Sequence, residues 1–370
     1  MGAMLRPTYN LPTLPPDANL ESVAILKALA KANRALGELK GKAVSIPNQS
    51  ILINTLALQE AKASSEIENI VTTQDELFRE DLLSEMTESP TAKEVARYRD
   101  TLRLGHEFLQ AHGAIANRSI ISMYRVLKSR QDGFRNAPGT TLRNDRTGEI
   151  IYVPPQTRAD IEHHMNELEQ FINEPDLCDL DPLIKMALIH HQFESIHPFA
   201  DRNGRIGRII NVLYLCLNDL LDIPVLYLSR FINANKDKYY QLLQDVRDQG
   251  FWQAWVLFML EAVEQTAIIT LSIVEGMRAQ MNSMKQRMRT QLPKLYSQDL
   301  LNNLFRHPYT RIEFVQNDLR ITRQTAARYL DILTENGFVQ KVSAGRSNYF
   351  INVPLVTLLS EAAGERVSGA

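Results

Sequence analysis

Apolar residues recur at helical spacing along most of the chain, which predicts a mainly α-helical protein. Glycine and proline separate most of the periodic segments from one another. These segments are 20–39, 50–63, 73–109, 115–130, 182–196, 206–217, a helix through Tyr239 and Tyr240 to Val246, and 251–289. The two most apolar of the central helices, 182–196 and 206–217, flank a short polar connection.

One segment has a different pattern. Residues 140–144 and 149–153 are rich in β-branched or aromatic residues and flank Asp145-Arg146-Thr147-Gly148, which is typical turn chemistry. This pattern predicts a β-hairpin, and a plain surface hairpin is one interpretation of it.

The C-terminal part predicts a small domain of its own. Helices are expected at 298–305, 311–317 and 323–336, followed by two strand-like runs around 343–347, and this order suggests a winged helix. Thr322 is a good N-cap for the third helix, where Arg323, Gln324 and Arg328 could meet phosphates or bases of DNA. However, residues 297–352 hold seven Lys or Arg against five Asp or Glu. A protein-interaction or dimerisation role therefore competes with DNA binding.

The polar connection 197–208 holds the residues with the clearest chemistry. Arg205 and Arg208 lie three apart near a helix N-terminus, where two cations and free backbone N–H groups favour a phosphate or carboxylate. Asp201 beside such an anion suggests a bridging Mg²⁺. His197 offers a neutral imidazole near pH 7. A purely structural helix-loop-helix is the alternative interpretation. A zinc site at His190, Glu194 and His197 is disfavoured, because no further ligand has matching spacing.

This stretch resembles the signature of Fic-domain proteins, HPF-x-[D/E]-G-N-G-R-x-x-R. Eight of the nine specified positions match, and Arg202 stands where the family has Gly. The resemblance implies a helical Fic core that transfers AMP from ATP to a protein hydroxyl. By motif position, His197 would be the base and Asp201 the Mg²⁺ ligand. Asn203, Gly204 and Arg205 would cradle the α- and β-phosphates and Arg208 would reach the γ-phosphate, while Arg202 strains the turn or adds a phosphate contact.

A second motif lies upstream. Ser64, Glu68 and Asn69 resemble the inhibitory motif [S/T]-x-x-x-E-[G/N] of some Fic proteins, whose Glu pairs with the second Arg of the signature, here Arg208. The same stretch fits a capping box, with Ser65 and Glu68 starting a new helix. On spacing alone the capping box is favoured.

The resemblance also gives the hairpin and the tyrosine pair a role. Fic proteins carry a hairpin flap at this point that lines the active site and pairs with target backbone, here through Thr147, Gly148, Glu149 and Ile150. In similar proteins a tyrosine pair lies against the nucleotide, which makes Tyr239 and Tyr240 nucleotide-binding candidates.

Together these features predict three parts: an N-terminal helical region with the inhibitory motif (1–95), the Fic core (96–290) and a winged helix (291–370). The net charge of −2 excludes a strongly basic nucleic-acid binder as a description of the whole chain. Two cysteines form no disulfide framework, which predicts a cytoplasmic protein. The apolar run 254–274 resembles a membrane span, but Glu261 and Glu264 at its centre favour a soluble core helix.

The expected activity is a protein adenylyltransferase that uses ATP and Mg²⁺, is autoinhibited by Glu68, and modifies a Ser, Thr or Tyr of a protein target or of itself. Whether the protein forms a homodimer is left open. Three alternatives stay open: hydrolytic removal of AMP from a modified protein, use of another phosphate-containing donor, and a winged-helix transcription regulator whose core senses nucleotide.

Overall fold

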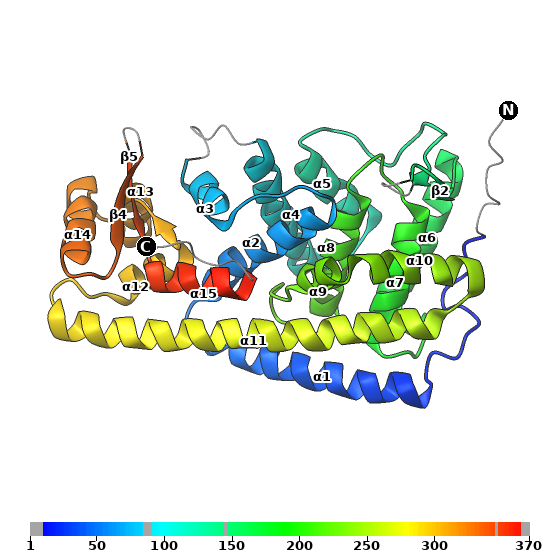
Figure 1. Cartoon of the computed structure of the whole chain (residues 1–370), viewed down its shortest axis with the longest axis horizontal. Coiled ribbons are helices and arrows are strands. Elements are labelled where there is room, and N and C mark those ends of the chain that lie inside the picture. Colours follow the sequence, from blue (N-terminus) through cyan, green and yellow to red (C-terminus); the bar gives the residue numbers. More distant parts are fainter. Residues whose placement is uncertain (1–9, 84–89, 144–146, 345–346, 364–370) are drawn as a thin grey trace. The chain divides into compact units, whose positions relative to one another are not determined.

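The computed structural model describes residues 10–83, 90–143, 147–344 and 347–363, and these ranges are mainly helical as predicted (Figure 1). Their fifteen α-helices are α1 Val23–Ala43, α2 Ser50–Ile67, α3 Gln74–Leu83, α4 Pro90–His112, α5 Asn117–Lys128, α6 Arg158–Asn173, α7 Pro182–Ile196, α8 Asn203–Leu217, α9 Leu228–Ala234, α10 Lys236–Gln249, α11 Trp252–Gln291, α12 Gln298–Arg306, α13 Ile312–Leu319, α14 Arg323–Glu335 and α15 Val353–Ala363. The strands are β1 Leu142–Arg143, β2 Ile150–Tyr152, β3 Tyr309–Thr310, β4 Gln340–Ala344 and β5 Ser347–Ile351, and a 3₁₀ turn spans Pro175–Leu177.

The chain divides into two compact units. The first contains residues 1–37 and 100–266, and the second contains residues 38–99 and 267–370. The boundaries fall inside α1, α4 and α11, so three continuous helices carry the chain from one unit to the other.

The first unit is built around the helices α7 and α8, which pack against each other, and α6 also packs against α7. Every residue of α7 from Leu183 to Ile196 is buried, including the polar side chains of His190, His191 and Glu194. Trp255 of α11 is fully buried and donates a hydrogen bond from its indole nitrogen to the carbonyl of Ala187 at 2.8 Å. The polar connection between α7 and α8 is therefore held by a rigid helical frame.

The second unit contains the C-terminal domain, in which α12, β3, α13, α14, β4 and β5 follow one another in the order of a winged helix. Its sheet is antiparallel with the strand order β3-β5-β4, and Tyr309 pairs with Ile351. The strand β3 was not predicted, because two residues are too few to show a period. Thr322 caps α14 as predicted, accepting from the backbone N–H of Thr325. In the same unit α12 packs against α2, and α3 packs against β3.

Several element boundaries correct the sequence-based expectations. Helix α8 begins at Asn203 and not at Ile206, so the Asn203-Gly204 pair forms the first helical turn. Helix α2 continues to Ile67, which places Ser65 inside its last turn. The capping-box interpretation of Ser65 and Glu68 is therefore wrong, because a helix ends there and none begins. Helices α6 and α15 were not predicted.

Among the described residues one helix, α11, is long and apolar enough to cross a membrane by length and composition alone. Of its most apolar window, 56% is buried inside the protein. A core helix passes the same test, so this is weak evidence for a membrane span.

Candidate functional site at the α7–α8 connection

The connection between α7 and α8 holds two residues in the left-handed backbone region. His197, directly after α7, has φ 50° and ψ 57°, and its N–H donates to the carbonyl of Phe193. Arg202, directly before α8, has φ 60° and ψ 16°. A non-glycine residue in this region costs about 1–2 kcal/mol, so surrounding contacts must hold the loop in shape. The Gly that Fic signatures carry at the Arg202 position would adopt this conformation without that cost.

The side chain of Phe199 packs into the core and anchors the loop there. Its ring is fully buried and stacks on Tyr124 of α5 with a centroid distance of 3.9 Å, and it also contacts Phe134 and Phe193. The side-chain amide of Asn203 closes the loop from the other end. Its Oδ1 accepts from the N–H of Phe199 and its Nδ2 donates to the carbonyl of Phe199, both at 2.9 Å. Asn203 is 1% exposed, and both polar atoms of its side-chain amide are used within the loop.

His197 is held as a neutral imidazole. Burial, followed by the charges of Arg135 and Arg247, lowers its pKa to about 3, and the nearby Glu194 carbonyl offsets only part of this. Its buried Nδ1 has no hydrogen-bond partner among the residues that the structure describes. A neutral imidazole can accept a proton, and the negative charge of a bound phosphate would make it a stronger base.

Arg135 holds the backbone at His197. It is 6% exposed, and its Nε donates to the carbonyl of His197 at 2.9 Å. Its Nη2 donates to the carbonyl of Pro155 and lies 3.5 Å from that of Ile196, while the backbone N–H of Arg135 donates to the carbonyl of Pro198. One guanidinium thus joins the signature loop to the segment that follows the hairpin.

A second link joins the hairpin to the end of α7. The hydroxyl of Tyr152 in β2 donates to the carbonyl of Ser195 at 2.8 Å. Arg247 of α10 lies over the Tyr152 ring at 4.2 Å and donates from Nε to the hydroxyl oxygen of Ser195. The base of the hairpin is therefore fixed next to His197.

The hairpin itself is present, with β1 paired to β2 in antiparallel register. Thr147, Gly148 and Glu149 are exposed and Ile150 is half-buried. Asp145 and Arg146, which belong to the predicted turn, lie outside the described residues. The exposed tip and the fixed base together suit a flap.

Asp201 is surrounded by donors. Its Oδ1 accepts from the Tyr124 hydroxyl at 3.0 Å and from Lys128 Nζ at 3.2 Å, and its Oδ2 accepts from Arg202 at 3.2 Å. Burial alone would raise the pKa of this carboxyl, but these hydrogen bonds and charges hold it below its usual value. Asp201 is therefore a carboxylate that already has two cationic partners.

The early turns of α8 carry the two signature arginines, and both side chains are buried, Arg205 to 3% and Arg208 to 1% exposure. Gly207 between them allows α7 and α8 to approach closely, since a Cβ there would lie 2.8 Å from Glu194 Oε1. The backbone N–H groups of the first helical turn have no partner within the helix. This end of α8 thus offers cations and backbone donors to an anion.

Tyr239 and Tyr240 have different surroundings. Tyr239 is 1% exposed, and its hydroxyl lies 2.8 Å from Nε2 of His190, whose Nδ1 faces the Asn211 amide at 3.0 Å. Tyr240 is 47% exposed. Burial, together with the charge of Arg208, lowers the pKa of His190 to about 3, so this histidine is neutral. Contact of either tyrosine with a nucleotide remains a prediction.

The upstream motif lies at the end of α2 in the second unit. Ser64 is fully buried within the helix, Glu68 is its half-buried C-cap, and Asn69 follows with φ 62°. The motif thus forms a helix C-terminus. Because Arg208 belongs to the first unit, the pairing of Glu68 with Arg208 stays a prediction.

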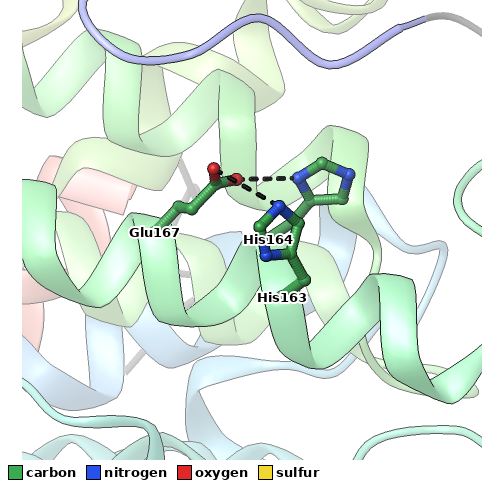
Figure 2. Close-up of side chains that lie close together, drawn as sticks. All are labelled: His163, His164 and Glu167. Atoms are coloured by element: carbon green, nitrogen blue, oxygen red, sulfur yellow. Dashed lines mark hydrogen bonds and ion pairs between the residues drawn. The ribbon is translucent and has the colours of Figure 1, made fainter.

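A cluster of metal-type ligands lies elsewhere. His163, His164 and Glu167 of α6 lie close together (Figure 2), and three of their ligand atoms lie within 4.8 Å of one another. Glu167 already accepts from His164 at 3.0 Å and lies 3.5 Å from His163. One carboxylate thus contacts both imidazoles, which accounts for the proximity of the three side chains.

Models of known protein families match most of the chain, including the α7–α8 site. The Fic/DOC family N-terminal model matches residues 26–107 and the Fic/DOC family model matches residues 106–215, which together cover more than half of the chain. The chain belongs to the Fic/DOC family. A third model, the C-terminal domain of SoFic-like protein adenylyltransferases, matches residues 280–355.

Two curated Fic proteins are similar to part of this chain. The chain is 30% identical over 118 residues to "Protein adenylyltransferase Fic" of Aedes aegypti and 26% identical over 155 residues to that of Drosophila erecta. The matched regions are 31% and 41% of this chain but only 21% and 28% of those relatives.

Solved Fic structures share the fold. A Fic family protein from Desulfovibrio desulfuricans G20 has a TM-score of 0.56 at 17% identity, and the match covers 89% of this chain and 96% of that one. Fic-1 from C. elegans has a TM-score of 0.52 at 18% identity over 68% of this chain and 73% of that one.

The Fic core of this chain, as arranged here, does not fit a divalent cation at Asp201. Mg²⁺ needs free oxygen lone pairs and few positive neighbours, whereas both oxygens of Asp201 accept from a cation. No chemical step is therefore assigned to a metal held by this carboxylate.

Four residues of the Fic site were missed by sequence reasoning: Tyr124, Lys128, Arg135 and Arg247. A buried charged residue looks the same in a sequence as an exposed one. The four-residue spacing of Tyr124 and Lys128 on one helix face was the only signal available for that pair.

Proposed function

We propose that this Fic protein transfers AMP from ATP to a hydroxyl side chain of a protein. The observation that carries the proposal is the position of His197, whose neutral imidazole stands next to the N-terminus of α8 with its two buried signature arginines. The similarity to proteins named protein adenylyltransferase supports the same activity.

In this account the target hydroxyl oxygen attacks the α-phosphorus of ATP while the bond to pyrophosphate breaks. His197 takes the hydroxyl proton on Nε2, because its Nδ1 is buried. The N-terminal backbone groups of α8 with Arg205 and Arg208 stabilise the negative charge on the phosphates. Such a reaction depends mainly on positioning and charge neutralisation, and the base should contribute about 10²–10⁴ in rate.

The hairpin supplies the place for the target. Its base is fixed by Tyr152 and Pro155, while Thr147 and Glu149 at its tip are exposed. An extended target segment would add to this two-stranded sheet as a further strand and bring its hydroxyl toward His197.

Glu68 is proposed to restrain the activity. A carboxylate on Arg208 would compete with ATP phosphate for the same guanidinium donors. Its place at the end of a stable helix, α2, would hold it in a defined position.

The test is incubation of the purified protein and candidate targets with ATP labelled at either the α- or the γ-phosphate. AMP transfer predicts protein label from the α-labelled nucleotide only. Label from the γ-phosphate would show phosphoryl transfer, and release of AMP from a pre-modified target without new labelling would show a hydrolase.

A further inference from the structure

The surroundings of Asp201 differ from those expected of a metal-ligating carboxylate. Two cations and one hydroxyl converge on it from two directions: Tyr124 and Lys128 from α5, and Arg202 from the signature loop itself. Arg202 adopts a left-handed backbone to stand there, and its side chain is 16% exposed.

Three oxygen atoms surround the ammonium group of Lys128. Its Nζ lies 3.1 Å from the Tyr124 hydroxyl, 3.2 Å from Asp201 Oδ1 and 3.6 Å from Asp132 Oδ2. The side chain is only 13% exposed. Although burial lowers the pKa of an ammonium group, the hydrogen bonds to Tyr124 and Asp201 raise that of Lys128 overall. Lys128 therefore keeps its charge, with three oxygens around it.

We propose that Lys128 and Arg202 act as built-in counter-cations of Asp201, which compete with a divalent cation for its carboxylate. The two residues thereby determine how tightly this site holds a metal ion. Without nucleotide the site therefore binds a divalent cation weakly. This inference rests on the proposed function for its biological meaning, but the competition itself is a binding property.

The size of the effect follows from charge proximity. An opposite charge within about 4–6 Å changes the proton affinity of a carboxylate by about 10- to 1,000-fold, and a divalent cation meets the same competition. Asp201 is partly exposed, which screens the effect toward its lower limit. Removing either cation should therefore strengthen metal binding by about tenfold.

The experiment is a titration of the full chain with Mn²⁺, without nucleotide, followed by the electron paramagnetic resonance signal of free Mn²⁺. The variants are Arg202→Gly, Lys128→Met, and each of these combined with Asp201→Asn. Arg118→Gln is the matched control, because it removes one exposed positive charge from the same helix as Lys128. Subtracting the Asp201→Asn titrations removes metal bound at the His163, His164 and Glu167 cluster.

The expected result is that Arg202→Gly and Lys128→Met each bind Mn²⁺ about tenfold more tightly than wild type. The gain disappears with Asp201→Asn, and Arg118→Gln behaves as wild type. Arg202→Gly puts glycine at a left-handed position, so it should fold. The proposal is overturned if wild type already binds as tightly as both variants, or if the gain survives Asp201→Asn. If the Mn²⁺ affinities follow this pattern but the wild-type protein does not transfer AMP, the result counts against the proposed function and not against this inference.

Discussion

The guanidinium of Arg135 donates a hydrogen bond to the backbone carbonyl of His197 at 2.9 Å. The same side chain reaches Pro155 behind the hairpin and Ile196 at the end of α7. The left-handed conformation of His197 is therefore stabilised by a residue 62 positions upstream.

Replacing Arg135 by lysine should slow AMP transfer by about 10²-fold, because a small displacement of a catalytic group has this effect. A single ammonium cannot reproduce the planar fork that spans these carbonyls. The measurement is the single-turnover rate at saturating ATP. Arg125→Lys, an exposed arginine that bonds only the carbonyl of Asp132 among the contacts described, is the control and should keep the wild-type rate. Equal rates for both variants would exclude a positioning role for Arg135.

Asn203 should prove to be a loop clamp. Asn203→Ala removes two buried hydrogen bonds to Phe199, and leaving those backbone groups unpaired should lower the free energy of unfolding by about 2–4 kcal/mol. Asn235→Ala is the matched control, because Asn235 makes a single half-buried bond to Phe231 and should cost about 1 kcal/mol. Chemical denaturation measures both. Equal losses would show that the Asn203 amide does not hold the loop.

Two buried histidines of the core should make stability depend on pH. Burial lowers the pKa of His190 to about 3 and that of His191 well below its usual value. Between the ordinary histidine pKa of about 6.5 and these lower values, only the unfolded chain binds the protons. The free energy of unfolding should therefore fall as pH falls below about 6.5, by about 1.4 kcal/mol per pH unit for each histidine.

Urea denaturation at about pH 7 and about pH 5.5 tests this dependence. His190→Gln should reduce the pH dependence of the free energy of unfolding by the contribution of one histidine, about 1.4 kcal/mol per pH unit. A wild-type stability that stays constant over this range, or a slope that His190→Gln leaves unchanged, would contradict the assignment of buried neutral imidazoles.

Glu68→Gly should increase AMP transfer by at least about tenfold, because it removes a charge-assisted competitor for the phosphate-binding arginine. The initial rate of labelling from α-labelled ATP measures the effect. Glu66→Gly, which removes a carboxylate of the same helix that pairs with Lys62, should leave the rate unchanged. An unchanged or lower rate in Glu68→Gly, with ATP binding intact, would remove Glu68 as the restraint.

The sequence predicted the helical class, the α7 helix with its observed bounds, the hairpin and the three helices of the C-terminal domain, because strong periodicity and local turn chemistry determine these features. The start of α8 was missed because the Asn-Gly pair normally marks a turn. Here the Asn203 side chain bonds back to Phe199, and the helix begins at Asn203 itself.

The candidate site was predictable only where a contiguous motif carries it. The signature indicated His197 and its arginines, but Tyr124 and Lys128, which bind Asp201, and Arg135, which binds the His197 backbone, lie more than 60 positions away. Local pattern contains no information about such pairs. The upstream motif shows the opposite problem, since Ser65 and Glu68 fit a helix start by spacing and lie at a helix end.

The central claim is that His197 accepts the proton during transfer of AMP to a protein hydroxyl. The most direct measurement is the intact mass of the Glu68→Gly protein, and of a target protein, after incubation with ATP and Mg²⁺, compared with Glu68→Gly combined with His197→Ala. The account predicts a mass increase of one AMP group on the protein or its target, which His197→Ala abolishes. An equal mass increase in both variants would contradict it.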